Sequence, residues 1–297
     1  MDLDLFIVAV FCRIDDTLKL LFQGKRLRQR GPAPVLSDSE VLTMEVVGEY
    51  LGLSQDTALF RYFRQHFRHF FPGLERVHRT TFVRQAANLW NVKERVWQQL
   101  LGSIRYDPTF ALVDSFPLPA CQFARAYRCQ RFRGEAAFGP DTIGVTRQTF
   151  YGFRVHVHLS WPGVITRFTV APANVHELSV VPQLAEGTRG VLVGDRNYWS
   201  PRLTEELRQG NVTLVAPFGS RKRDPRPRFS STLSRLRYRI DTVFGQLVDR
   251  YQVKRVWAKD IWHLNSRLLR KVLSHTIVFL LNQTQGNPPL QLAKLLV

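Results

Sequence analysis

The chain has 297 residues, of which 44% are hydrophobic, including 21 Phe and 6 Trp. This composition suffices for a hydrophobic core and excludes a globally disordered chain. The 42 basic and 24 acidic residues give a formal net charge of +18. Such an excess is typical of proteins that bind a polyanion, most often nucleic acid.

The positive charge is concentrated in the last third of the chain. Residues 1–100 contain 14 basic and 11 acidic side chains, and residues 101–200 contain 10 and 7. Residues 201–297 contain 18 and 6, which is a net charge of +12. Generic basicity would be spread more evenly, so this distribution indicates a binding surface.

Cysteine usage and hydropathy indicate a soluble, cytoplasmic protein. Cys12, Cys121 and Cys129 form no CxxC pair, so neither a disulfide framework nor a zinc knuckle is expected. The apolar run Leu5–Cys12 is short and follows two acidic residues, unlike a signal peptide. No apolar stretch approaches the roughly 18 residues that span a bilayer, so we expect no membrane partner.

Residues 1–104 have the pattern of an all-α domain. The SDSE sequence of Ser37–Glu40 predicts a capping box for a helix over 41–51, and further helices are expected over 58–71 and 80–101. Short helices joined by Gly-containing turns are compatible with a helix-turn-helix-like unit that binds DNA ends. A helical bundle with one exposed basic face is the alternative.

Residues 105–297 predict an α/β domain with C-terminal helices. Five strands are expected, over 110–116, 150–160, 164–171, 190–194 and 212–216. Helices are expected over 174–185 and 201–209, and later from near residue 232 and over 264–282. Together these elements predict a mixed five-stranded sheet with flanking helices. A basic Pro/Arg/Ser loop covers residues 217–232.

Two acids occupy apolar strands. Asp114 lies within FALVDSF, and Asp195 directly follows GVLVG. An ionised carboxylate in an apolar sheet costs several kcal/mol unless it is paired or binds a metal. The alternative is that each acid ends a strand and caps a turn or a helix.

A third acid, Asp241, lies in the helix after the basic loop. An ordinary pair with Arg237, four residues earlier, is the alternative interpretation. The three acids come in the order strand, later strand, helix. A ribonuclease H-like fold gathers its ligands for two divalent ions in this order. Two such ions can activate a nucleophile and neutralise a phosphodiester. Asp249, about 12 Å further along the helix axis, is the alternative third acid.

Six boxes of the sequence resemble a bacterial insertion-sequence transposase of the DDE class. They are LSDSEVLTMEVVGEYLG (36–52), LVDSFPLPAC (112–121), TFYGFRVH (149–156), PANVHEL (172–178), VGDRNYWS (193–200) and RYRIDTVFGQL (237–247). The boxes keep the family's order and cover most of the chain.

The resemblance implies a ribonuclease H-like catalytic domain that uses Mg²⁺ or Mn²⁺. Such a domain cuts DNA at terminal inverted repeats and joins the 3′ ends to target DNA. Asp114 and Asp195 match the first two catalytic acids, and Asp241 stands where the family usually has Glu. Glu177 replaces the usual acid of the PANxxD-like box and is an auxiliary candidate.

Basic and aromatic side chains are candidate DNA contacts. The predicted phosphate contacts are Arg221, Lys222, Arg223, Arg226, Arg228, Arg237, Arg128 and Arg131. Tyr198 and Trp199 would stack on an unpaired base, with core packing as the alternative. His156, a second auxiliary candidate, shares a strand face with His158, and both are expected to line the sheet or touch DNA.

The sequence therefore predicts a two-metal DDE/D transposase acting on double-stranded DNA. A homodimer or larger synaptic complex is expected, because two DNA ends must be held together. The expected location is the bacterial cytoplasm, with association with the nucleoid when DNA is bound. A catalytically inactive DNA-binding relic and a structure-selective nuclease of the same fold are the alternatives.

Overall fold

The computed structural model describes residues 1–297 except 26, 29, 142–147, 218–230 and 297. The chain divides into a helical unit, Met1–Ile104 with Leu247–Val297, and a sheet unit, Arg105–Gln246. The predicted domain 105–297 differs from this division, because the residues after 246 pack with the N-terminal helices. No helix in the described part of the chain is both long and apolar enough to cross a bilayer.

The helical unit is built from α-helices joined by short turns. Its elements are α1 (Leu3–Phe22), α2 (Asp38–Tyr50), α3 (Asp56–His66), η1 (Pro72–Glu75), α4 (Arg79–Asn88), α5 (Trp90–Leu101), η4 (Val253–Arg255), α9 (Ile261–Thr284) and η5 (Leu292–Lys294). The predicted capping box is present, since Ser37 and Glu40 each accept the other's backbone N–H. The helix predicted over 80–101 is two helices, because Leu89 leaves the helical conformation.

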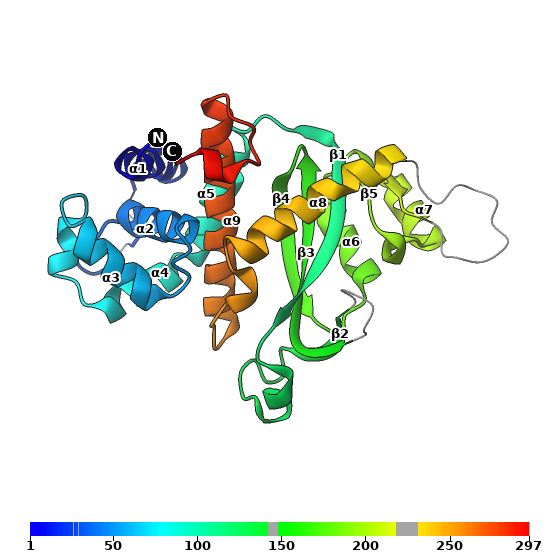
Figure 1. Ribbon diagram of the computed structural model, residues 1–297, viewed down its shortest axis with the longest axis horizontal. Coiled ribbons are helices and arrows are strands. Elements are labelled where there is room, and N and C mark those ends of the chain that lie inside the picture. The colour runs from blue at the N-terminus through cyan, green and yellow to red at the C-terminus, as the bar shows by residue number, and fades with distance from the viewer. Residues whose placement is uncertain (26, 29, 142–147, 218–230, 297) are drawn as a thin grey trace. The chain divides into compact units, whose positions relative to one another are not determined.

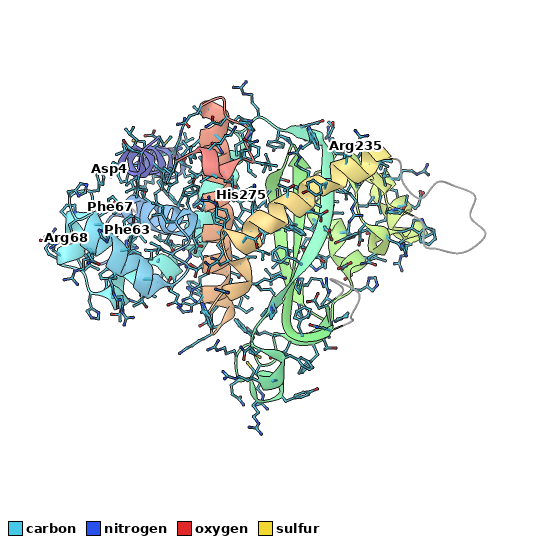
Figure 2. All side chains as sticks on the ribbon, in the orientation of Figure 1. Asp4, Phe63, Phe67, Arg68, Arg235 and His275 are labelled. Carbon is cyan, nitrogen blue, oxygen red and sulfur yellow. The ribbon has the colours of Figure 1, made fainter. Side chains whose placement is uncertain are left out.

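Helix α3 shows how hydrophobic spacing orients a helix in this unit. Phe63 and Phe67 are buried, whereas Arg68 is exposed (Figure 2). Arg61 and Arg64 are exposed as well, so α3 presents basic side chains to solvent.

Helix α9 is the core of the helical unit. It contacts α2, α4 and α5, and every residue from Leu268 to Asn282 is buried. A helix that is buried on all sides needs neighbours on all sides. The N-terminal helices therefore complete their core only with a segment from the other end of the chain.

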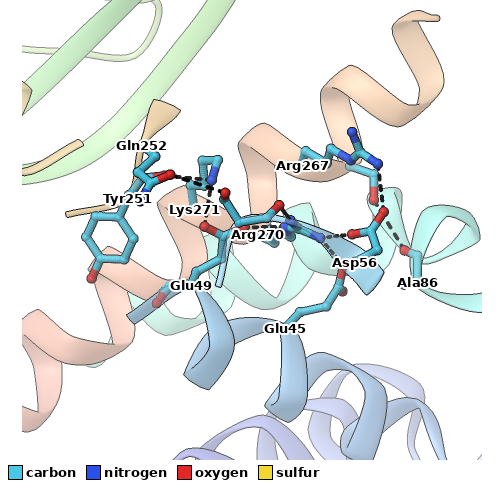
Figure 3. Close-up of polar contacts among 12 residues, drawn as sticks. Glu45, Glu49, Asp56, Ala86, Tyr251, Gln252, Arg267, Arg270 and Lys271 are labelled. Carbon is cyan, nitrogen blue, oxygen red and sulfur yellow. Dashed lines mark hydrogen bonds and ion pairs between the residues drawn. The ribbon is translucent and has the colours of Figure 1, made fainter. Parts of the chain in front are cut away.

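Charged side chains that are buried or half-buried at this core form what we call the ionic network (Figure 3). Its members are Glu45, Glu49, Asp56, Lys93, Arg267, Arg270 and Lys271. Glu49 accepts from Arg270 and, at 2.6 Å, from Lys271. Asp56 accepts from Arg270 at 2.5 Å and from Arg267 at 2.6 Å.

The ionic network includes a further buried pair, and its surroundings shift the pKa values of several members. Lys93 donates to Glu45 at 2.8 Å. Burial opposes ionisation of Asp56, but Arg270 and Arg267 outweigh it and lower its pKa to about 2. Burial lowers the pKa of Lys271 to about 8. The network joins α2, α3, α5 and α9 through paired charges.

The sheet unit contains a mixed sheet with helices on both faces. Its elements are β1 (Asp107–Pro119), η2 (Phe123–Arg128), β2 (Ala137–Asp141), β3 (Gln148–Trp161), β4 (Val164–Pro172), α6 (Glu177–Ala185), β5 (Gly190–Val193), η3 (Arg196–Tyr198), α7 (Pro201–Gln209), β6 (Val212–Val215) and α8 (Ser231–Asp249). The last residues of α8 belong to the helical unit.

The strand order is β2-β3-β1-β5-β6, with β4 also paired to β3. β1 is antiparallel to β3 and parallel to β5, and β5 is parallel to β6. All five predicted strands are present. The additional strand β2 was not predicted, because its sequence AFGPD contains Gly and Pro, which are disfavoured in strands.

Alternation along β1 sends side chains to two differently covered faces. Val113 packs in a core with residues of α6 and α7, such as Val181 and Leu207. Phe116 packs on the other face against Phe244 of α8, with ring centroids 5.0 Å apart. Figure 1 shows α8 crossing in front of the sheet. These helices on both faces are what the predicted ribonuclease H-like fold requires.

Candidate active site

The two strand acids are brought together by the parallel register of β1 and β5. Phe110 pairs with Val191, and Leu112 pairs with Val193. Extending this register by two residues sets Asp114 opposite Asp195. The carboxyl end of β5 therefore presents one carboxylate beside another on the neighbouring strand.

A tight turn after β5 fixes the position of Asp195. Its carboxylate caps η3 by accepting the backbone N–H of Asn197 at 2.8 Å. A Cβ added at Gly194 would lie 2.8 Å from the Cβ of Tyr198, so the glycine allows the tyrosine to pack against this turn. Tyr198 is fully buried in the core. Asp195 is thus held by a turn that is anchored in the sheet unit.

The electrostatic environment opposes ionisation of both acids. Burial raises the pKa of Asp114 to about 7; the charges of Asp195 and Glu177 add to this shift, against the Ser115 N–H and Arg237. Burial also raises the pKa of Asp195, and Glu177 adds to the shift. The site therefore concentrates negative charge that a nearby cation would neutralise.

Glu177 is a further acid near the two aspartates, and its charge raises the pKa of both. It begins α6 and accepts from the Ser115 hydroxyl at 2.6 Å and from Arg154 Nη1 at 3.0 Å. Arg154 is buried, so it needs this carboxylate partner. Our sequence reasoning missed Ser115 and Arg154. The signal was an arginine at a buried position of the strand FYGFRVHVHLS.

The third predicted acid, Asp241, lies on α8 with an exposed side chain. Arg237, one turn earlier, is half-buried, and its charge lowers the pKa of Asp114 and Asp195. Over the residues that the structure describes, no group of three Asp, Glu, His or Cys side chains is arranged to hold a metal ion. The structure brings Asp114, Asp195, Glu177 and Arg237 together at the candidate site.

Several predicted DNA contacts have different surroundings in the structure. Tyr198 is fully buried, so no ring face is available for a base, whereas 41% of Trp199 is exposed. Arg128 is exposed and Arg131 is half-buried. The predicted contacts Arg221, Lys222, Arg223, Arg226 and Arg228 lie outside the described residues.

The paired histidines of β3 line the sheet. His158 is buried between the hydroxyls of Thr166, at 2.7 Å, and Thr188, at 3.2 Å. His156 is also buried, and its ring nitrogens have no hydrogen-bond partner within the described structure. Burial lowers the pKa of each to about 4. Neither imidazole is exposed for contact with DNA.

The donor set of the site fits a divalent cation in part. Asp114 and Asp195 supply hard oxygen ligands side by side, and Mg²⁺ binds to few carboxylates while keeping several waters. Burial raises the pKa of both carboxylates despite the charge of Arg237, and a bound cation would favour their ionised forms. A third carboxylate ligand would come from Asp241 or Glu177.

Comparisons with known proteins identify the family of the chain. A model of the transposase DDE domain matches residues 107–259, just over half of the chain. A solved structure of the piggyBac transposase synaptic complex with hairpin DNA is similar at 12% identity and a TM-score of 0.47, covering 99% of this chain and 78% of that chain. No curated protein sequence gives a significant match. Since the matched segment contains Asp114, Asp195 and Asp241, the chain belongs to the transposase DDE domain family.

Proposed function

We propose that this protein is a transposase that cuts DNA at terminal inverted repeats of a mobile element and transfers the freed 3′ ends to target DNA. The observation that carries the proposal is the pair of carboxylates, Asp114 and Asp195, within the matched domain. The family is generally dependent on divalent metal ions, and we propose two Mg²⁺ or Mn²⁺ ions as cofactors.

Each side chain of the site has a defined task in this proposal. Asp114 and Asp195 would hold the metal ions through their carboxylate oxygens. When bound, the ions supply activation of the attacking hydroxyl and stabilisation of the leaving oxygen. Arg237 favours the ionised form of both acids and can donate to a phosphate oxygen.

We assign Asp241 as the third ligand and Glu177 as a positioning residue. Asp241 matches the family's third acid but is one methylene shorter than the usual Glu, and its side chain is exposed. It would reach the ions through a shift of α8 or through a bridging water. Glu177 is already engaged by Ser115 and Arg154, which favours a structural task at the edge of the site.

The proposed partner is double-stranded DNA, namely terminal inverted repeats and target DNA. In the helical unit, α3 presents Arg61 and Arg64 to solvent. Arg79 and Arg84 of α4 line an open pocket of about 290 Å³, and their guanidinium groups can donate to phosphate oxygens at its rim. We propose a homodimer or larger synaptic assembly, acting in the bacterial cytoplasm at the nucleoid.

A catalytically inactive DNA-binding relic is a second candidate. The exposed position of Asp241 favours it, because a short acid that fails to reach the ions would leave DNA binding intact without turnover. A structure-selective nuclease would use the same two aspartates but would not require terminal repeats.

The test is metal-dependent cleavage and strand transfer on DNA taken from the flanks of the gene. Wild type is compared with Asp114→Asn, Asp241→Asn, Asp241→Glu and Glu177→Gln. We expect wild type to cut and join, and both Asn variants to lose more activity than the about 10–100-fold that is typical when a residue supporting a metal ligand is lost. Asp16→Asn, an exposed acid of α1, is the matched control and should retain activity.

The outcomes separate the candidates. Cleavage by Asp241→Glu alone would identify a disabled copy. Binding without cleavage by any variant would establish the relic. Cutting of branched DNA without end joining would establish the nuclease. Loss of activity in Glu177→Gln but not in Asp241→Asn would identify Glu177, and not Asp241, as the third metal ligand.

A further inference from the structure

The segment between β1 and β2 presents aromatic rings to solvent. Tyr127 is 81% exposed, Phe123 is 48% exposed and Phe138 is 40% exposed. We call these three residues the aromatic platform. Large exposed aromatic side chains that gather in one place mark interaction sites in soluble proteins.

The rings of the aromatic platform lie against one another. Tyr127 stacks on Phe138 with centroids 5.3 Å apart and planes 30° apart. Phe123 lies beside Tyr127 at 6.4 Å, and Phe138 lies against the buried Tyr151 at 5.1 Å. Because Tyr127 stacks on only one neighbour among the described residues and remains mostly exposed, it can accept a further flat ring.

The base of the segment is fixed to the sheet. The Tyr151 hydroxyl donates to the carbonyl of Phe132 at 3.2 Å, and the Phe132 ring is buried against Phe153. The thiol of Cys121 contacts the thiol of Cys129 across the two ends of η2. These contacts orient the platform before any partner arrives, which reduces the entropic cost of binding.

The charge around the platform selects the class of partner. Arg125, Arg128 and Arg133 are exposed on the same segment. Aromatic rings interleaved with arginines are suited to a strand that offers both flat bases and phosphates. In double-stranded DNA the base faces are occupied by stacking, so only unpaired bases can use the rings.

We propose that the aromatic platform binds unpaired bases of DNA, with Tyr127 as the stacking residue and Arg125 and Arg128 as phosphate contacts. This inference rests on the proposed function and deepens it. The segment begins after Pro119, five residues along β1 from Asp114, which is about 17 Å at the rise of a strand. A DNA strand engaged at the acids can therefore extend along β1 towards the segment that carries the platform.

The test uses the full chain with EDTA, so that no cleavage is needed. The probes are a single-stranded 15-mer containing 2-aminopurine and the same sequence as a duplex. Stacking on Tyr127 is expected to quench the 2-aminopurine fluorescence. Tyr127→Ala should weaken binding of the single strand about tenfold, the typical loss for one stacked base, and should abolish quenching. Tyr127→Phe retains the ring and should bind within about twofold of wild type.

Two controls separate stacking from general effects. Trp257→Ala removes an aromatic of the helical unit that is 56% exposed and should change neither probe's affinity. Arg125→Ala with Arg128→Ala should weaken binding and lower its salt dependence while leaving the quenching of the bound probe intact. Duplex binding should be unaffected by Tyr127→Ala.

Three results would overturn the proposal. Unchanged single-strand affinity in Tyr127→Ala would show that the ring does not stack on a base. Equal losses for single strand and duplex would indicate a general basic surface. A change of oligomeric state in Tyr127→Ala, without a change in quenching, would assign the platform to a contact between copies of the chain. Because EDTA prevents metal-dependent cutting, these results are independent of whether the protein cuts DNA.

Discussion

Asp114, in the middle of β1, and Asp195, just after the carboxyl end of β5, stand opposite each other in the extension of a parallel register that runs from Phe110 to Leu112 on β1. Burial raises the pKa of both acids, the charge of Asp195 adds to the shift at Asp114, and Arg237 compensates only in part. A fold that sets two carboxylates this way stores electrostatic repulsion that a bound cation would relieve. This relationship makes the stability of the metal-free protein dependent on pH.

Replacing Asp114 with Asn should stabilise the metal-free protein at pH 8. The pKa of Asp114 is raised from 3.8 to about 7 on folding, so the folded state holds its proton more tightly. The contribution of Asp114 to the free energy of unfolding is fully present below pH 3.8 and is lost as the pH rises through 7. Above pH 7, the buried carboxylate costs a few kcal/mol of stability. Denaturant unfolding at pH 8 should show Asp114→Asn more stable by about 2–4 kcal/mol. Equal or lower stability than wild type would contradict the raised pKa that burial and the neighbouring charges give Asp114.

Divalent ions should stabilise the protein in a pH-dependent way. Metal competes with protons for the carboxylates, so Mg²⁺ or Mn²⁺ should raise Tm more at pH 8 than at pH 6. Asp114→Asn and Asp195→Asn should each remove this increase, whereas Asp16→Asn should retain it. A monovalent salt of equal ionic strength is the control. A metal effect of the same size in the Asn variants would place the binding elsewhere.

Breaking the ionic network should unfold the helical unit more readily. Glu49→Gln would leave Arg270 and Lys271 buried with fewer partners, and loss of one member of a buried ion pair costs about 3–5 kcal/mol. The matched control is Glu205→Gln, which breaks an exposed pair with Arg208 and should cost less than about 1 kcal/mol. Equal losses of stability in the two variants, measured by calorimetry, would show that the buried ion pairs contribute no more to stability than the exposed pair.

His158 should make the sheet unit sensitive to mild acid. Burial lowers its pKa from 6.5 to about 4, so the unfolded state binds a proton first as pH falls. Stability is therefore full above pH 6.5 and declines towards pH 4. Between pH 7 and pH 5, wild type should lose about 2 kcal/mol more than His158→Gln, measured by urea unfolding at both values. Parallel curves for the two proteins would refute this.

Adding a methyl group at Gly194 should disturb the site more than the fold. Its Cβ would meet the Tyr198 side chain at 2.8 Å, which forces the turn that holds Asp195 to shift. We expect a stability loss of about 1–3 kcal/mol together with a weaker metal-induced rise in Tm. Gly102→Ala, where the nearest atom is 3.4 Å away, is the control and should leave metal binding unchanged.

The strands and the acids within or just after them could be predicted from the sequence because their signals are local. Apolar runs such as FALVDSF and GVLVGD reveal both a strand and the acid that interrupts it. The capping box at Ser37 is equally local and was confirmed. In each case the residues that define the element lie within a few positions of one another.

The features that escaped prediction depend on distant segments. The position of α9 in the helical unit follows from packing against α2 and α5, which no window of sequence contains. The bond between Glu177 and Arg154 joins α6 to β3. Burial of Tyr198 depends on the space left by Gly194. The helical signals of α9 were clear, but they carried no information about its neighbours.

The helical unit is interrupted in the sequence by the whole of the sheet unit, and its central helix α9 is made after that unit. As the chain leaves the ribosome, the sheet and its two aspartates are available for folding before the N-terminal helices have their core. Those helices must wait for more than a hundred further residues of synthesis, and a fragment ending at Ile104 would lack the helix that they surround. The helical unit can therefore complete its fold only after the segment that contains Asp114 and Asp195 has been synthesised.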